Sequence, residues 1–373
     1  RLIKRGFKFG ALCVQEDTMV RALGLLASLV RTLGLLLTLG LATAQRAELH
    51  VHWDGAVTTK TLLEAAQLRN LSLPTIGRPT HEWEIALLID ANFGFKAFDV
   101  VNDILGGDAA TLALASERFV DAQAANNVTY TEVRYDPARA ARSSYANASI
   151  SQDAAVAAVR AGLRRGMRSH PGVVAHQILC AMRGSSPEAC GAVADLAARS
   201  RSDAPGGVVG IDLAGDEWGT DNARYVDCFR RAKDDLGLNT TVHVGETLPW
   251  PLRSSTLDDV VTAVLDMRAD RLGHGYAAAK NATALELLRD RGVHLEACPT
   301  TAKGEGSLDA IAAYKAHNLS FSINRDDPCI GCGDERTAAA EEAVVVAGLG
   351  FDAGDLDRAD REARRHAFGS GAA

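Results

Sequence analysis

Eight short apolar runs recur along the chain between longer stretches rich in Ala, Leu and Arg. Most of the runs are continuous or nearly so, as expected of parallel strands covered on both faces, and their connections are long enough for crossover helices. The predicted strands are residues 47–52, 128–135, 173–180, 208–214, 240–245, 271–275, 293–298 and 319–324.

Eight strand–helix units in about 320 residues predict an α/β fold, a (β/α)8 TIM barrel, with a doubly wound open sheet as the alternative. The connection over residues 55–127 is too long for one helix and carries Phe93, Phe95 and Phe98. It predicts extra helices that either cover the barrel mouth as a lid or pack these rings in a core of their own. Residues 334–373 predict helices that close the barrel.

Composition and charge narrow the class of ligand. The chain is 47% hydrophobic and 23% charged, which is ordinary for a globular protein, and its formal net charge is −7. It has no basic stripe that would favour nucleic acid or an anionic membrane surface, so the expected ligand is a small molecule. Nothing in the sequence indicates an oligomeric state.

The first 44 residues differ from the rest. Residues 1–18 resemble no functional segment and are set aside as an unassigned extension. Residues 19–44 predict a cleaved signal peptide, because an apolar run is followed by the small-x-small pattern Ala42-Thr43-Ala44. A membrane anchor is the alternative, but Arg31 divides the apolar stretch into pieces too short to span a bilayer comfortably. Residues 45–373 are then a secreted barrel without stable membrane insertion; without a natural leader the protein would be cytoplasmic.

Sequons and cysteines agree with secretion. Six asparagines lie in N-x-S/T sequons, which predicts a glycoprotein: Asn70, Asn127, Asn147, Asn239, Asn281 and Asn318. Removing Cys13 with the leader leaves six of the seven cysteines. Cys180 with Cys190 is a candidate bridge, although spacing cannot fix the connectivity.

Polar residues gather where the predicted strands end, which is where a barrel of this kind builds its site. His50 and His52 lie on one face of the first strand, two residues apart, so both can bind one metal ion. With His243 and Asp326 they form a nitrogen and oxygen set suited to one Zn²⁺ per chain, with a position left for water. The histidines outside strand ends are expected to be non-functional: His81, His170, His176, His317 and His366.

The motifs together resemble the adenosine deaminase family of zinc amidohydrolases, from Arg46 almost to the C-terminus. They are residues 48–55 (ELHVHWDG), 132–135 (EVRY), 210–217 (GIDLAGDE), 242–246 (VHVGE), 271–275 (RLGHG), 296–299 (EACP) and 322–328 (SINRDDP). Trp53 stands where the family usually has Leu, and Val244 where it has Ala. Because Trp53 is bulky and expected beside the pocket, it puts the preferred substrate size in question.

The resemblance implies hydrolytic deamination of adenosine, and of 2′-deoxyadenosine, to the inosine product and ammonia. It implies that His50, His52, His243 and Asp326 bind zinc, with His52 also contacting substrate. His274 would orient the attacking water and Glu246 would protonate ring N1. Asp327 would bind the N7 side and aim the nucleophile. The Gly215 N–H would contact N3 and Asp54 the ribose 5′-hydroxyl.

Three alternatives remain beside this interpretation. The substrate could be another aminopurine, adenine or N6-methyl-AMP. His294 and Glu296 with Cys329 and Cys332 match the H-x-E and P-C-x-x-C order of cytidine-deaminase-type zinc sites, but residues 293–298 are predicted as a strand interior. If that match is fortuitous, Cys329 and Cys332 form a local bridge or packed thiols. A non-catalytic, growth-factor-like extracellular binding protein is disfavoured because no ligand or acid is lost.

Overall fold

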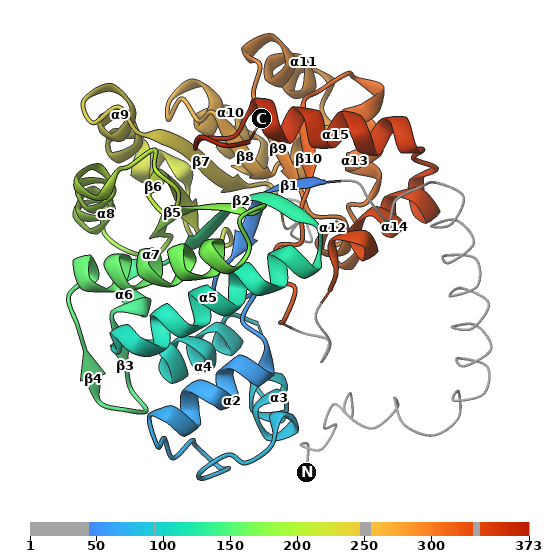
Figure 1. Ribbon diagram of the computed structural model, residues 1–373. Helices are drawn as coiled ribbons and strands as arrows, with labels where there is room; N and C mark the ends of the chain where they lie inside the picture. The colour runs from blue at the N-terminus through green and yellow to red at the C-terminus, as the bar shows by residue number, and fades with distance from the viewer. Residues whose placement is uncertain (1–44, 93, 247–254, 331–335, 373) are drawn as a thin grey trace, which may run out of the picture. The chain divides into compact units, whose positions relative to one another are not determined.

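The computed structural model describes residues 45–372 except 93, 247–254 and 331–335. Within these residues, eight parallel strands form one sheet in the order β1-β2-β5-β6-β7-β8-β9-β10 (Figure 1). The strands are β1 (Arg46–His52), β2 (Val128–Tyr135), β5 (Val174–Met182), β6 (Val208–Ala214), β7 (Asn239–Val244), β8 (Arg271–His274), β9 (His294–Ala297) and β10 (Phe321–Ile323). The predicted signal segment lies outside the described residues.

The sheet closes on itself between its first and last strands. The His52 N–H donates to the Asp326 carbonyl (2.9 Å), and the Asp326 N–H donates to the His50 carbonyl (3.2 Å). A parallel bridge between Val51 and Asp326 accompanies these bonds. The predicted (β/α)8 barrel is therefore confirmed and the open doubly wound sheet is wrong.

The long first connection holds four helices: α2 (Thr59–Leu68), α3 (Glu82–Asp90), α4 (Phe95–Leu105) and α5 (Ala109–Ala125). Two predictions for this segment competed, a lid and a separate packed core. Phe95 is 54% exposed, and both Phe95 and Phe98 line the cavity described below, which favours the lid for these two rings. Phe93 lies outside the described residues.

The remaining helices follow the strands around the barrel, together with an antiparallel ribbon of β3 (Arg142–Ser143) and β4 (Ala148–Ser149). They are α6 (Pro137–Ala140), α7 (Gln152–Ser169), α8 (Pro187–Ser200), the 3₁₀ helix η2 (Asn222–Tyr225), α9 (Val226–Asp234), α10 (Ser255–Leu265), η3 (Tyr276–Lys280), α11 (Ala282–Arg291), α12 (Pro299–Gly304), α13 (Asp309–Ala316), α14 (Ala338–Leu349) and α15 (Ala353–Arg365). Within the described residues, no helix is long and apolar enough to cross a membrane.

Close helix packing explains two glycines. A Cβ on Gly162 of α7 would stand 2.1 Å from the Ala113 carbonyl oxygen of α5, and one on Gly166 would stand 2.5 Å from the Val120 side chain. Because a real Cβ cannot approach so closely, only glycine lets α7 lie against α5 here. This pair of helices thereby holds the lid segment to the outer layer of the barrel.

The C-terminal segment closes the base of the barrel, as predicted. Ala363 of α15 and Ala372 pack in one buried cluster with Leu49 of β1 and Tyr130 of β2. The Gly369 N–H donates to the Tyr130 hydroxyl (2.9 Å). The chain end therefore covers the side of the barrel away from the carboxyl ends of the strands.

The cysteine pairing differs from the candidate bridge. Cys190 of α8 is bonded to Cys228 of α9, so the predicted pairing of Cys180 with Cys190 is wrong. Cys180 is a buried thiol in β5 that faces the cavity, whereas Cys190 lies in the outer helix layer against α9. Cys332 lies outside the described residues, so its predicted proximity to Cys329 stays a prediction.

Candidate active site

A cavity of about 240 Å³ opens at the carboxyl ends of the barrel strands. Eight of the predicted site residues line it: His52, Asp54, Gly215, His243, Glu246, His274, Asp326 and Asp327. His50, the ninth, is fully buried and clusters with His243, His274 and Asp326. The fold therefore brings every predicted site residue together.

Atoms of the four predicted metal ligands lie in two groups that share Asp326: one holds His50, His243 and His274, and the other holds His52 and Asp327. His52 Nε2 lies 3.1 Å from His243 Nε2. Asp326 Oδ1 lies 3.2 Å from His50 Nε2 and 3.5 Å from His52 Nε2. Atoms bound at about 2.0–2.1 Å to a tetrahedral zinc ion lie about 3.3 Å from one another. The set therefore fits zinc, and the buried His50 Nε2, which has no hydrogen bond within the described part of the chain, is suited to bind the metal.

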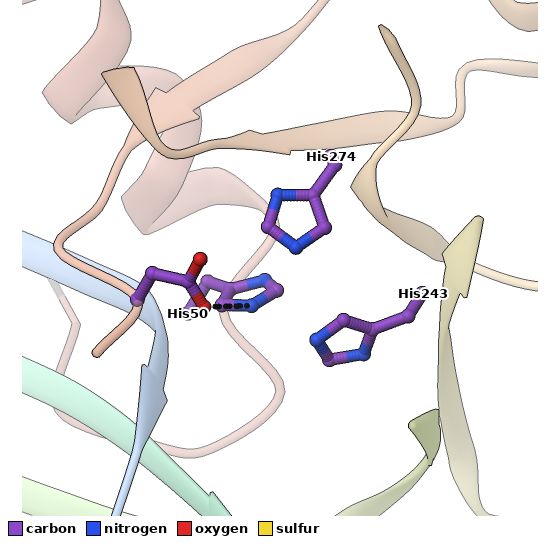
Figure 2. A group of neighbouring side chains, drawn as sticks. His50, His243 and His274 are labelled. Atoms are coloured by element: carbon purple, nitrogen blue, oxygen red, sulfur yellow. Dashed lines mark ion pairs between the residues drawn. The ribbon is translucent and has the colours of Figure 1, made fainter. Parts of the chain in front are cut away.

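Figure 2 shows His50, His243 and His274 turned toward a common centre, with a dashed ion pair between His50 and the neighbouring carboxylate. His274 Nε2 lies 3.6 Å from Glu246 Oε2, and His274 Nδ1 lies 3.3 Å from the Tyr276 hydroxyl. His274 is thus next to both the ligand cluster and the predicted acid. This position suits a group that handles a proton of the attacking water.

Two buried carboxylates orient two of the histidines. His50 Nδ1 lies 2.8 Å from Glu296 Oε2, and His243 Nδ1 lies 2.8 Å from Asp212 Oδ2. A carboxylate on Nδ1 fixes the proton there and leaves Nε2 free to bind a metal. Both carboxylates therefore favour the tautomer and orientation that metal binding through Nε2 requires.

Arg134 joins these two carboxylates beneath the site. Its guanidinium lies 3.1 Å from Asp212 Oδ2 and 2.7 Å from Glu296 Oε2, and Arg271 Nε lies 2.7 Å from Glu296 Oε1. All four side chains are fully buried. All four lie in the strand motifs, where charged residues inside predicted buried strands were the sequence signal for a buried ionic network. These arginines hold the pKa of Glu296 well below its ordinary value, although burial alone would raise it.

Backbone geometry turns two site residues into the mouth of the barrel. His274 has φ 64° and Asp326 has φ 63°, in the left-handed region that residues other than glycine rarely adopt. Such conformations persist where surrounding contacts hold them, often at functional sites. Here the Tyr314 hydroxyl donates to the His274 carbonyl (3.0 Å).

A Cβ on Gly55 would stand 1.8 Å from Asp327 Oδ1, so this glycine makes room for Asp327.

Burial sets the protonation of the acids and bases. Burial, followed by the charges of Asp326 and Glu217, raises the pKa of Glu246 well above its ordinary value. Burial lowers the pKa of His274 well below its usual value, against the opposite effect of Asp326. Glu246 is therefore easier to protonate than an ordinary glutamate, and His274 is harder to protonate than an ordinary histidine.

This geometry corrects one expectation and argues against one alternative. Trp53 does not line the cavity: it is fully buried, and its Nε1–H donates to Ser116 Oγ of α5 (3.1 Å). The reason is strand alternation, which sends Trp53 to the face opposite His52. The cytidine-deaminase-type alternative is not supported either, because both ring nitrogens of His294 bond to the hydroxyls of Ser320 and Ser322 (2.8 and 2.9 Å).

A parallel barrel with this cluster of histidines and an aspartate at its strand ends defines a metal-dependent hydrolase of the amidohydrolase type. The chain belongs to the adenosine deaminase family, whose model matches residues 45–372. It is therefore an enzyme of a family that uses zinc.

Relatives of known name agree with this assignment. The chain is 28% identical to adenosine deaminase of Bos taurus, covering 87% of this chain and 89% of the relative. It is 30% identical to adenosine deaminase of Vibrio parahaemolyticus, covering 81% and 87%.

Solved structures show the same fold. One is a zinc-bound amidohydrolase from Burkholderia ambifaria, at TM-score 0.71 and 23% identity, covering 87% of this chain and 86% of that one. Another is an adenine deaminase from Arthrobacter aurescens, at TM-score 0.72 and 20% identity, covering 88% and 94%.

Proposed function

We propose that the protein is a zinc-dependent adenosine deaminase, which hydrolyses adenosine and 2′-deoxyadenosine to inosine or 2′-deoxyinosine and ammonia. The observation that carries this proposal is the zinc-sized arrangement of His50, His52, His243 and Asp326 in one cavity with Glu246 and His274. Family membership supports it.

His50, His52, His243 and Asp326 would hold zinc, which would lower the pKa of a bound water and so supply a nucleophile at neutral pH. Asp212 and Glu296 orient His243 and His50 for this binding. His274 would orient the water and accept its proton. Attack at the purine C6 transfers charge to the ring, where protonated Glu246 would donate its proton to N1.

The other cavity residues would hold the purine. Asp327 would meet the N7 side, where its place beside Asp326 lets it aim the nucleophile. Gly215 has φ 99° and no side chain, so a ring can approach its backbone N–H at the purine N3. The C6–N bond would then break as the departing amino group takes up the proton that His274 accepted. The C6 hydroxyl would lose its proton to solvent as the product carbonyl forms, and ammonia would leave.

Charge around Asp54 favours a nucleoside over a nucleotide. Two carboxylates, Asp54 and Asp136, line the cavity together with Arg139, and both Asp136 and Arg139 are close enough to Asp54 to affect its pKa. Arg139 is already paired with Asp99 (2.7 Å) and lies 3.8 Å from Asp136. A 5′-phosphate would therefore be repelled by the two carboxylates. Arg139 would offset this repulsion only in part, because its charge is already shared with Asp99 and Asp136. A free base would forgo any contact with Asp54.

Ultraviolet assays of purified, zinc-quantified protein test the proposal against its alternatives. Adenosine and 2′-deoxyadenosine should be deaminated with higher kcat/KM than adenine, AMP or N6-methyl-AMP. Higher kcat/KM on AMP or N6-methyl-AMP would indicate a nucleotide deaminase. Zinc-replete protein without turnover on any of the five would support a non-catalytic binding protein.

Asp54→Ala should lower kcat/KM for adenosine by about 1–3 kcal/mol, the range for a lost hydrogen bond to a charged group. The same change should narrow the advantage of adenosine over 5′-deoxyadenosine, which lacks the hydroxyl that Asp54 would accept from. Steady-state kinetics on both nucleosides measure this, with Asp90→Ala as the control, because Asp90 is an exposed carboxylate at the end of α3. Equal losses on both nucleosides would make Asp54 structural and remove the argument for nucleoside over base.

We further propose that the protein is a secreted glycoprotein that begins near Gln45 after cleavage. The Cys190–Cys228 disulfide supports an oxidising compartment. Five sequon asparagines are exposed, but Asn239 is partly buried and donates its Nδ2–H to the Val209 carbonyl (2.9 Å). Asn70, Asn127, Asn147 and Asn318 also have positive φ, which by itself favours asparagine.

Expression through a secretory pathway should therefore give a cleaved protein with glycans on the exposed sequons and none on Asn239. Glycans at Asn127 and Asn318 would lie at strand starts, away from the cavity. Mass spectrometry with and without deglycosylation measures both site occupancy and the new N-terminus. Recovery of only uncleaved, unglycosylated protein from the cytosol of its native cell would contradict the proposal.

A further inference from the structure

A buried asparagine links α4, the lid helix that carries Phe95 and Phe98, to Asp54 in the cavity lining. Asn102 of α4 is 5% exposed and Asp54 is 7% exposed. Asn102 Nδ2 donates to Asp54 Oδ2 at 2.7 Å and to the Phe98 carbonyl at 2.9 Å. A side-chain amide has two N–H donors, and both are used here.

This hydrogen bond restricts the orientation of the Asp54 carboxylate, which a ligand in the cavity would contact. A hydrogen bond from a neutral amide to a carboxylate is stronger than one between neutral groups, and here it is shielded from water by burial. With Oδ2 held by Asn102, Oδ1 is the oxygen of Asp54 that is available to a ligand in the cavity. Asn102 itself does not line the cavity, so it would act through Asp54.

The same helix carries the aromatic side of the cavity. Phe95 and Phe98 both line it, and the Phe98 ring centroid lies 6.4 Å from that of His52. Because Asn102 also bonds to the Phe98 carbonyl, one side chain connects the carboxylate on the β1 end to the backbone of the lid helix. A shift of α4 would therefore also change the orientation of the Asp54 carboxylate.

An asparagine is an unusual residue at a buried position inside a helix. Asparagine is a weaker helix former than leucine, and a buried polar side chain is costly unless it is bonded. The other buried residues of α4 are apolar: Ala97, Val100, Val101, Ile104 and Leu105. Packing of α4 alone would favour an apolar residue at position 102. The asparagine there instead supplies the N–H that donates to Asp54.

We propose that Asn102 is a specificity-determining positioning residue, which holds Asp54 to accept the 5′-hydroxyl of a nucleoside and couples that contact to the lid helix. This inference rests on the proposed function and adds to it a residue outside the cavity that selects for the hydroxyl. The selected class is nucleosides with a free 5′-hydroxyl.

Asn102→Leu tests this, because leucine has a similar volume and no donor. We expect kcat/KM for adenosine to fall about 10-fold, the effect of losing a hydrogen bond to a charged group, and that for 5′-deoxyadenosine to fall less than about 2-fold. The same substitution made in an Asp54→Ala background should change kcat/KM for adenosine by less than about 2-fold, because coupled residues are non-additive. Asn92→Leu is the matched control, since it removes an amide whose one bond within the described residues is to a backbone carbonyl (Leu88, 2.7 Å) in the same segment.

Zinc content and thermal unfolding of each variant separate a folding defect from a change in specificity. Asn102→Ala, which is smaller, provides the same comparison if the leucine variant does not fold. Equal losses on both nucleosides, or full additivity with Asp54→Ala, would overturn the inference while leaving the deaminase proposal standing. Wild-type protein inactive on both nucleosides would overturn the proposed function and this inference with it.

Discussion

His243→Ala should leave the protein with little or no zinc and no measurable deamination. His243 Nε2 lies 3.1 Å from His52 Nε2, so its removal takes one of four donors from the proposed site. Loss of a group that only orients a ligand weakens metal binding about 10–100-fold, and loss of a ligand itself should cost more than about 100-fold. Removal also leaves the fully buried Asp212 carboxylate without its histidine partner, and Arg134 alone then compensates its charge.

Elemental analysis after dialysis against a weak chelator measures the zinc that remains bound. His170→Ala is the control, because His170 is a partly exposed histidine paired with Asp121 outside the cavity. That variant should retain one zinc per chain and wild-type turnover. Full zinc occupancy in His243→Ala would rule out the proposed ligand set.

Glu246→Gln should keep zinc but lose about 10²–10⁴-fold in kcat, the range expected for a missing general acid. The amide has nearly the shape of the acid and can hydrogen-bond to a ring nitrogen, but it cannot deliver a proton. Glu246 lies 3.6 Å from His274 and is not among the proposed ligands, so the metal should be unaffected. The two variants therefore separate metal binding from proton transfer.

Steady-state kinetics with parallel zinc analysis make this measurement. Glu305→Gln is the matched control, because Glu305 is an exposed carboxylate whose charge contributes to the raised pKa of Glu246 but which does not line the cavity. It should retain turnover within about 2-fold, as is usual for surface substitutions. Near-normal kcat in Glu246→Gln would remove Glu246 from the role of acid.

Short-range sequence patterns were sufficient to predict the barrel and most residues of the site. Strands buried on both faces must be apolar, so the eight runs could be recognised without knowing their partners. Alternation placed His50 and His52 on one face, and the rule that barrel sites form at strand ends brought His243, His274 and Asp326 to the same rim. The same alternation would have placed Trp53 away from the cavity, since it follows His52 by one residue.

Contacts between distant segments were decided only by the tertiary structure. Arg134 bonds to Glu296, 162 residues away, because barrel closure places both inside one ring of strands. Cys190 pairs with Cys228 because α8 and α9 are neighbours, and spacing along the chain does not encode that neighbourhood. Asn102 meets Asp54 only once α4 lies over the end of β1.

What the sequence determined by itself was the set of elements and the chemistry at their ends, because side-chain alternation, apolar runs and ligand types are properties of short segments. The tertiary structure decided which buried charges compensate each other, which thiols pair and which helix contacts Asp54 in the cavity lining. These depend on the relative placement of elements separated by tens to hundreds of residues, and no short-range pattern records that placement.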